Sequence, residues 1–208
     1  MQENAQTEEK LITFDDLGLK KEILRSIKDA GFTVPSPIQA AAIPFILAGR
    51  DIVGQAHTGT GKTAAFGLPA LNNIDPNDGV GLLVITPTRE LATQVSDELF
   101  KYGRNIGART VTVYGGSSYN RQIDLIDRGA SVVVATPGRL LDILKKNLLK
   151  NFAPSIVVLD EADEMLDMGF REDIEFVLSE MPEERQTLLF SATMSRDILN
   201  LKIGRAHV

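Results

Sequence analysis

The sequence predicts an α/β fold with a mostly parallel central sheet and helices on both faces. Short β-branched apolar runs recur along the 208 residues, amphipathic stretches lie between them, and the run 155–159 ends in three carboxylates within four residues. A short run that is apolar throughout is typical of a strand buried on both faces of a parallel sheet. Because 43% of the residues are hydrophobic and 24% are charged, the composition is that of an ordinary globular domain.

The expected strands share short, β-branched sequences: 51–56, 81–86, 109–114, 131–135, 155–159 and 187–190. The expected helices share apolar residues at helical spacing: 63–71, 89–105, 120–127, 138–146 and 172–181. Strands that alternate with helices form βαβ units, in which the strands run parallel. Each polar motif described below follows one of these strands. Since ligands bind beyond the carboxyl ends of such strands, we expect the motifs to converge on one edge of the sheet.

Composition excludes several classes of protein. The chain has no cysteine, which rules out disulfides and thiolate zinc sites and suits the cytoplasm, where we expect the protein to act. No uncharged apolar run approaches the ~18 residues of a membrane span, so we expect no membrane partner. The net charge of −6 argues against a protein that coats nucleic acid, although it leaves room for a narrow basic strip. We expect residues 1–10 to form a disordered acidic lead-in to one domain at 11–200.

The segment 56–63, which follows the first expected strand and opens a helix, fits the phosphate-loop pattern, with Ala56 in place of the usual first glycine. Its glycines would let backbone N–H groups turn toward phosphate oxygens at the helix N-terminus. Lys62 would reach the β- and γ-phosphates of a nucleotide, and the Thr63 hydroxyl would bind Mg²⁺. A plain Gly/Thr-rich turn is the alternative for the segment. For His57, a position on the outer turn of the loop is favoured over a catalytic role. The predicted nucleotide contacts of this loop are His57, Thr58, Gly59, Thr60, Gly61, Lys62 and Thr63.

The acids after the strand 155–159 supply the chemistry that such a nucleotide needs. A buried strand does not normally end in charge unless a cation or another partner compensates it. Asp160 would hold the magnesium ion, through water, opposite Thr63, and Glu161 would polarise the attacking water. With Lys62, these two acids form the predicted catalytic group. Asp163 either joins a hydrogen-bond relay or is a solvated acid in the first turn of a helix.

Together these residues resemble the DEAD-box family of ATP-dependent RNA helicases, whose name is spelled by residues 160–163. The resemblance extends from Phe14 to about Asn200, with a bacterial-type member favoured by the compact connections. It implies a RecA-like P-loop domain, ATP and Mg²⁺ as cofactors, and RNA as the partner. The elements that carry it, in chain order, are 31–39, 56–63, 87–92, 115–116, 136–139, 160–163 and 191–193.

The segment 31–39 resembles the motif with which the family recognises adenine. The amide of Gln39 has both donors and an acceptor, so it can pair with the edge of the base. Phe32 could stack on the base, although packing in the core is the alternative. Phe14 stands 17 residues before Gly31, and we expect it to be structural.

A second set of residues resembles the elements with which the family binds RNA. Guanidinium groups, hydroxyls and helix N-termini are common phosphate ligands, so the set would read the RNA backbone without sequence specificity. The alternatives are an ion pair between Arg89 and Glu90 or another acid, and an ordinary turn at 136–139. The predicted RNA contacts are Pro87, Thr88, Arg89, Gly116, Thr136, Gly138 and Arg139.

Ser191 and Thr193 follow the last expected strand. Their hydroxyls could bond Asp160 or Asp163, or they could cap a helix. The resemblance implies that Asp163, Ser191 and Thr193 couple ATP hydrolysis to unwinding.

The family has two RecA-like domains, and this chain resembles only the first. The likeness ends near residue 200, so we interpret 201–208 as a truncation scar or a foreign tail. An arginine supplied by another domain is worth about 10³–10⁵ in the rate of phosphoryl transfer. We therefore expect a monomeric chain that binds ATP–Mg²⁺ weakly, hydrolyses ATP very slowly and does not unwind duplexes alone. The alternatives are a non-catalytic RNA- or protein-docking module that uses ATP as a conformational ligand, and a P-loop ATPase that acts on DNA.

Overall fold

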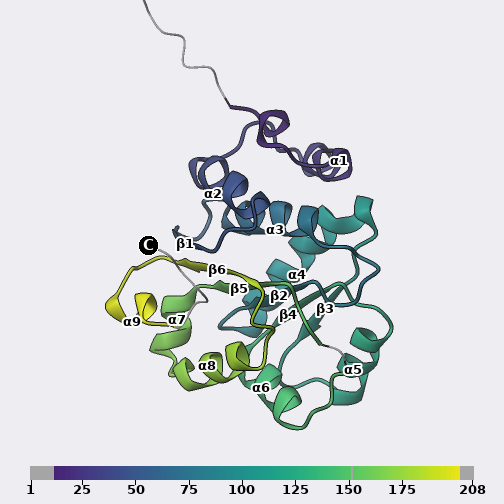
Figure 1. The fold of residues 1–208 in the computed structure, drawn as a ribbon, viewed down its shortest axis with the longest axis vertical. Coiled ribbons are helices and arrows are strands. Elements are labelled where there is room, and N and C mark those ends of the chain that lie inside the picture. The colour runs from purple at the N-terminus through teal and green to yellow at the C-terminus, as the bar shows by residue number, and fades with distance from the viewer. Residues whose placement is uncertain (1–11, 151, 202–208) are drawn as a thin grey trace, which may run out of the picture.

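A computed structural model describes residues 12–150 and 152–201 (Figure 1). In this part of the chain, six parallel strands form one sheet in the order β1-β6-β5-β2-β4-β3. The predicted α/β fold class is thus confirmed, and every predicted strand is present to within one residue at each end. The strands are β1 Ile52–Gln55, β2 Leu82–Ile85, β3 Thr110–Val113, β4 Val132–Ala135, β5 Ile156–Asp160 and β6 Gln186–Ser191.

The predicted helices are also present, as α3, α4, α5, α6 and α8. The sequence interpretation missed four α-helices and the short 3₁₀ helices. The α-helices are α1 Lys21–Asp29, α2 Pro37–Leu47, α3 Lys62–Asn73, α4 Arg89–Gly103, α5 Tyr119–Asp127, α6 Pro137–Lys145, α7 Ala162–Asp167, α8 Arg171–Ser179 and α9 Arg196–Leu199. The 3₁₀ helices are η1 Phe14–Leu17 and η2 Arg104–Ile106.

Pro37 is the first residue of α2, one of the helices that the sequence interpretation missed. Proline is tolerated there, since the first N–H of a helix has no intrahelical partner. Ser36 caps this helix, and Gln39 completes a capping box with it.

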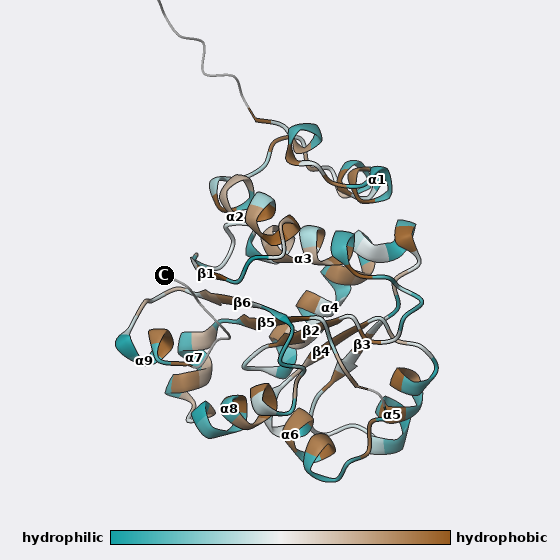
Figure 2. Ribbon diagram, viewed as in Figure 1, coloured by the Kyte–Doolittle hydropathy of each residue, from teal (hydrophilic) through white to brown (hydrophobic). Residues whose placement is uncertain are grey.

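The sheet is the middle of three layers. Alternate strand residues face opposite sides: Leu82 and Val84 pack with α1 to α4, and Leu83 and Ile85 pack with the helices from α5 onward. Figure 1 shows these two helical layers above and below the sheet. In Figure 2 the central strands are hydrophobic, whereas the outer helices carry hydrophilic and hydrophobic residues together. Helices on both faces explain why the inner strands β2 and β4 are apolar throughout.

The described residues contain no helix with the length and apolar character needed to span a membrane. Leu201, which the predicted foreign tail includes, is buried in the core between the sheet and the helices from α5 onward. Residues 1–10 and 202–208, for which we predict a disordered lead-in and the rest of that tail, lie outside the described residues.

Six of the seven motifs converge on one edge of the sheet, as predicted, because all the strands are parallel and these motifs lie at or after a strand's carboxyl end. The segment 31–39 precedes β1 and follows no strand, and it reaches this edge through the contacts of Ser36 and Gln39 with the phosphate loop. The strand order adds a division that the sequence did not reveal. The phosphate loop and the acids at 160–163 belong to the neighbouring strands β1, β6 and β5. The candidate RNA residues follow the other three neighbours, β2, β4 and β3.

Candidate active site

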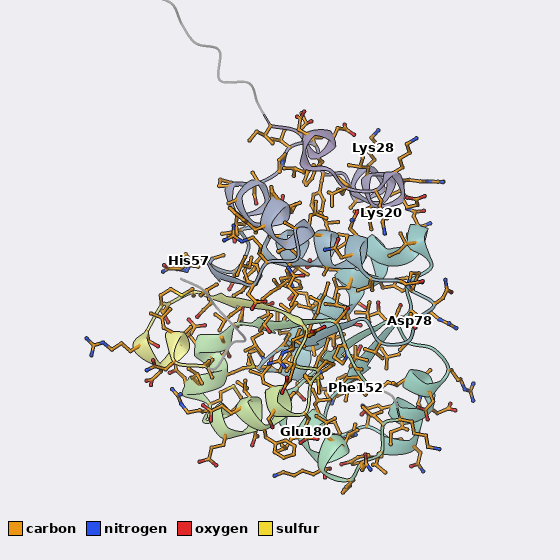
Figure 3. All side chains as sticks on the ribbon, in the orientation of Figure 1. Lys20, Lys28, His57, Asp78, Phe152 and Glu180 are labelled. Atoms are coloured by element: carbon orange, nitrogen blue, oxygen red, sulfur yellow. The ribbon has the colours of Figure 1, made fainter. Side chains whose placement is uncertain are left out.

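The phosphate loop connects β1 to α3, and its shape depends on two glycines. Gly59 (φ 82°) and Gly61 (φ 84°) adopt left-handed conformations that other residues reach only with strain. Thr60 Oγ1 donates a hydrogen bond to His57 O over 2.7 Å, which closes the turn. The loop ends where Lys62 begins α3, with Thr63 next to it. His57 is exposed and lies on the outside of the loop (Figure 3).

Two residues at the start of α2 hold the loop from one side. Ser36 Oγ donates to Thr60 O over 2.9 Å, and Gln39 Nε2 donates to Gly61 O over 3.0 Å. Gln39 Oε1 accepts a hydrogen bond from Ser36 N at 2.9 Å. Since only 4% of Gln39 is exposed, its amide contacts the loop backbone in this structure, and its pairing with adenine stays a prediction.

The two phenylalanines near this motif pack together. The ring centroids of Phe14 and Phe32 lie 6.3 Å apart, and those of Phe32 and Tyr102 lie 6.0 Å apart. Phe14 is buried in the core, as expected for a structural residue. Phe32 is only half-buried against the same core, so stacking of its ring on a base stays a prediction.

Lys62 joins the phosphate loop to the acids at the end of β5. Its Nζ atom lies 3.0 Å from Asp160 Oδ1 and 3.4 Å from Glu161 Oε1. Thr58 Oγ1 donates a second hydrogen bond to Glu161 Oε1 over 3.3 Å. The structure therefore brings the predicted catalytic residues together in one cluster.

Asp160 is the most buried acid of the cluster, with 1% of the residue exposed. Burial raises the pKa of Asp160, and the neighbouring Lys62 ammonium opposes that rise. Apart from the ion pair with Lys62, Oδ1 of Asp160 has no partner at hydrogen-bond geometry among the residues that the structure describes. The described residues contain no group of three or more acidic, histidine or cysteine side chains placed to hold a metal ion.

Glu161 has an unusual backbone. Its φ of 56° and ψ of 52° lie in the left-handed region, at the residue that precedes α7. For a residue with a Cβ atom, this conformation costs about 1–2 kcal/mol. Strain of this kind gathers at functional sites, where the surrounding structure holds it in place.

Asp163 and Thr193 link the acids at 160–163 to the segment after β6. Thr193 N and Thr193 Oγ1 both donate to Asp163 Oδ2, over 3.0 and 3.1 Å. Partial burial opposes ionisation of Asp163, but the hydroxyls of Ser191 and Thr193 more than offset it and lower the pKa of Asp163. Ser191 is close enough to contribute, although its buried Oγ meets no partner at hydrogen-bond geometry.

For Thr193, this link decides between the two interpretations, since its hydroxyl bonds Asp163. The helix-cap interpretation is wrong, because Ser195 caps α9 and accepts a hydrogen bond from Ile198 N at 3.3 Å. Ser191 itself is the last residue of β6, and does not follow that strand as predicted.

The candidate RNA residues lie on the other half of the edge. Arg89 Cζ lies 4.6 Å from the centre of the Tyr114 ring, and Arg139 Cζ lies 4.3 Å from that of Tyr119. Neither arginine forms an ion pair with any residue that the structure describes, so the predicted alternative of a pair between Arg89 and an acid is wrong here. Thr88 caps α4 by accepting from Leu91 N at 3.2 Å.

The remaining predicted RNA contacts differ in exposure. Gly116 (φ 89°) and Gly138 are exposed, Thr136 is half-buried at the start of α6, and Pro87 is buried.

Sequence reasoning missed several residues of this edge. Ser36 had a usable signal, since serine before proline with glutamine three residues later is a helix N-terminus pattern. Tyr119 and Gln122 had none, because polar and aromatic residues in an amphipathic helix normally face solvent or the core.

A separate hollow of about 410 Å³ lies between α2 and the free edge of β1. It is lined by Ile38, Phe45, Val53 and neighbouring residues, and by none of the residues predicted to contact ATP or RNA.

A parallel sheet with a phosphate loop after β1 and a buried acid at the end of β5, on the other side of β6, defines the class of α/β P-loop domains. Comparison with known proteins narrows this class. The family model described as DEAD/DEAH box helicase matches residues 36–201. The chain belongs to this family.

Two curated relatives and one solved structure show how close the similarity is. The chain is 57% identical over 189 residues to the DEAD-box ATP-dependent RNA helicase RhpA of Helicobacter pylori, covering 91% of this chain and 38% of that protein. It is 55% identical to CshA of Streptococcus pneumoniae, covering 87% and 35%. A DEAD box protein from Methanococcus jannaschii has the same fold, with a TM-score of 0.90 and 41% identity over 94% of this chain and 55% of that one. The chain thus spans little more than a third of the length of these curated relatives.

Proposed function

We propose that this chain is the ATP-binding half of an ATP-dependent RNA helicase that couples ATP binding and hydrolysis to RNA binding and local duplex unwinding. One observation carries the proposal. The sheet order groups the phosphate loop and the acids on β1, β6 and β5, and the candidate RNA residues on β2, β4 and β3. A nucleotide and an RNA strand would therefore bind side by side on one edge, and each could influence the other.

The nucleotide site would work through the phosphate loop and Lys62. The backbone N–H groups of the loop and the N-terminus of α3 would bind phosphate oxygens. Lys62 would leave Asp160 and Glu161 to bind the β- and γ-phosphates. Gln39, which already holds Gly61, would link the position of the base to the shape of the loop.

Magnesium fits this site, because Asp160 Oδ1 is a buried oxygen whose partner among the described residues is the Lys62 ammonium, and oxygen is the ligand that Mg²⁺ prefers. Asp160, through water, and the Thr63 hydroxyl would hold the ion, which supplies charge to neutralise the phosphates. Glu161 would orient the attacking water and accept its proton. Thr193 and Ser191 would transmit the change at these acids, since Thr193 is bonded to Asp163 next to them.

The RNA site would bind the phosphodiester backbone through Arg89, Arg139 and the exposed Gly116 and Gly138. Such contacts carry no base information, so binding would be independent of sequence. The family's second domain would complete the ATP site with arginine, which supports our proposal that this chain alone is nearly inactive. We propose that the protein acts as a monomer in the cytoplasm, on the RNA of that compartment.

The proposal is tested by measuring ATPase activity of the 208-residue chain and of the same chain joined to a complete second domain. We expect RNA-stimulated turnover only in the joined protein, and loss of that turnover in Lys62→Ala and Glu161→Gln. Steady RNA-stimulated turnover by the 208-residue chain would contradict the proposed division of the active site.

Filter binding separates the alternative functions. Single-stranded RNA and DNA are compared, each with and without a non-hydrolysable ATP analogue. Preference for DNA would favour a DNA-dependent ATPase. RNA binding that responds to the analogue, without turnover in the joined protein, would favour a docking module that uses ATP as a conformational ligand.

A further inference from the structure

Gln122 lies where two of the candidate RNA-binding loops meet, yet it belongs to none of the motifs described above. It is on α5, and only 5% of the residue is exposed. Its Nε2 donates to Tyr114 O over 3.1 Å and to Ser117 Oγ, and its Oε1 accepts from Arg139 Nη1 at 3.0 Å. One buried side chain therefore joins the end of β3, the loop that follows it, and α6.

Arg139 is held in a way that leaves part of its guanidinium group available. Nη1 donates to Ser117 O over 3.0 Å as well as to Gln122 Oε1. The guanidinium carbon lies 4.3 Å from the centre of the Tyr119 ring, which fixes its plane. Among the described residues, none accepts a hydrogen bond from Nε or Nη2 of Arg139. A guanidinium group carries donors on all three nitrogens, so this edge stays available for a phosphate.

The same amide also acts on the loop between β3 and α5. By bonding Tyr114 O and Ser117 Oγ, Gln122 fixes both sides of Gly115 and Gly116. The Tyr114 ring in turn lies 4.6 Å from the guanidinium carbon of Arg89. Both candidate RNA-binding arginines are thus supported, directly or through Tyr114, by one glutamine.

Glutamine suits this place because a primary amide donates and accepts at once. Glutamate would lose both donated bonds and would place a negative charge against Arg139, where it would compete with phosphate. Leucine would keep most of the volume and lose every bond.

We propose that Gln122 is a positioning residue for the phosphodiester backbone of RNA. It holds Arg139 and the 114–117 loop in one preformed arrangement, so that binding does not have to order them. This inference rests on the proposed RNA-binding function, and it adds to that function a residue that holds the RNA-binding groups in place.

The test uses the protein with a complete second domain, in the presence of a non-hydrolysable ATP analogue and a fluorescent single-stranded oligouridylate. Anisotropy gives the RNA affinity at several salt concentrations. We expect Gln122→Leu to weaken binding about tenfold, as for one lost hydrogen bond to a charged group. We also expect the slope of log affinity against log salt to fall by about 0.7, the value for one phosphate contact on a single strand.

A double-mutant cycle with Arg139→Ala tests whether Gln122 acts through Arg139. Because part of the loss in Gln122→Leu acts through Arg139 and part through the 114–117 loop, the loss in the double variant should be clearly smaller than the sum of the two single losses. Full additivity of the two losses would overturn the proposal.

Gln186 offers a matched control at the opposite end of the strands. It is also buried, with 8% exposed, and its Nε2 donates to Ile46 O over 3.1 Å and to Arg50 O over 2.7 Å. Gln186→Leu should lower stability and leave RNA affinity and its salt slope unchanged. If Gln122→Leu alters RNA binding no more than Gln186→Leu does, Gln122 is merely structural.

Two further variants keep the outcomes distinct. Gln122→Glu keeps the size of the side chain, and it replaces Gln122→Leu in the test if the leucine variant fails to fold. It should lower RNA affinity by at least the tenfold expected of Gln122→Leu. Unchanged affinity in Gln122→Glu would overturn the proposal. If Arg89→Ala and Arg139→Ala leave affinity and salt slope unchanged, the proposed RNA site itself is wrong, whatever Gln122 does.

Discussion

Lys62 Nζ lies 3.0 Å from Asp160 Oδ1, so the lysine expected to bind phosphate is ion-paired with the acid expected to face magnesium. Both residues are buried, with 6% and 1% exposed. The ammonium group is the cation that stabilises the ionised carboxylate against the effect of burial. If Lys62 turns toward phosphate oxygens, Asp160 needs another cation, and that is the position proposed for magnesium. Nucleotide and metal binding should therefore depend on each other.

The first prediction concerns this pair. Lys62→Ala should lower the free energy of unfolding by about 3 kcal/mol at neutral pH, because it leaves a buried carboxylate without its cation. The loss should shrink as the pH falls, since protonation of Asp160 removes the buried charge. Urea denaturation at a series of pH values measures both effects. The double variant Lys62→Ala with Asp160→Asn should recover much of the loss. Wild-type stability in Lys62→Ala would show that the ion pair does not stabilise the domain.

The second prediction concerns the left-handed backbone of Glu161, which has a φ of 56°. Glu161→Gly and Glu161→Ala both remove the carboxylate, but only glycine adopts this conformation without strain. We expect the glycine variant to be the more stable of the two by about 1 kcal/mol, measured by urea denaturation. Both should abolish ATP hydrolysis in the protein with a complete second domain. Equal stability of the two variants would mean that the backbone relaxes when the carboxylate is removed.

The sequence predicts the parts of this molecule that are set by local chemistry. The β-branched runs mark the strands because their apolar residues are buried on both faces, and the glycines and Lys62 mark the phosphate loop. The order of the strands has no local signal, since it depends on how helices on both faces pack. Gln122 escaped notice because its role comes from Tyr114, Ser117 and Arg139, which only the fold brings near it.

Gln39 shows a different limit. Its residue type correctly indicates a side chain that donates one hydrogen bond and accepts another. The sequence does not show that Gly61 O and Ser36 N are the partners in this structure. The start of α2 was not predicted, because Pro37 indicates a loop unless the capping residue Ser36 before it is considered.

The third prediction separates two adjacent glycines. Gly116 has a φ of 89°, and a Cβ atom there would lie 3.7 Å from Arg89 Nη1, whereas a Cβ atom on Gly115 would meet nothing within 4 Å. Gly116→Ala should lower the free energy of unfolding by about 1–2 kcal/mol and weaken RNA binding, because the left-handed loop is strained by a side chain. Gly115→Ala should change stability little. Urea denaturation and anisotropy measure the two effects, and equal behaviour of the variants would contradict a requirement for the left-handed turn.

The last prediction concerns Asp163, whose Oδ2 accepts hydrogen bonds from Thr193 N at 3.0 Å and Thr193 Oγ1 at 3.1 Å. Burial opposes ionisation of this acid, but the hydroxyls of Ser191 and Thr193 lower its pKa. A folded pKa below the unfolded value of about 4 gives stability that is present above that value and lost as the pH falls through the folded pKa. Thr193→Val should therefore reduce the free energy of unfolding by about 1 kcal/mol at neutral pH. The difference should approach zero once Asp163 is protonated in both proteins. Denaturant titrations at stepwise lower pH measure this difference, and a constant value would mean that Thr193 stabilises the domain by packing, independently of its bond to Asp163.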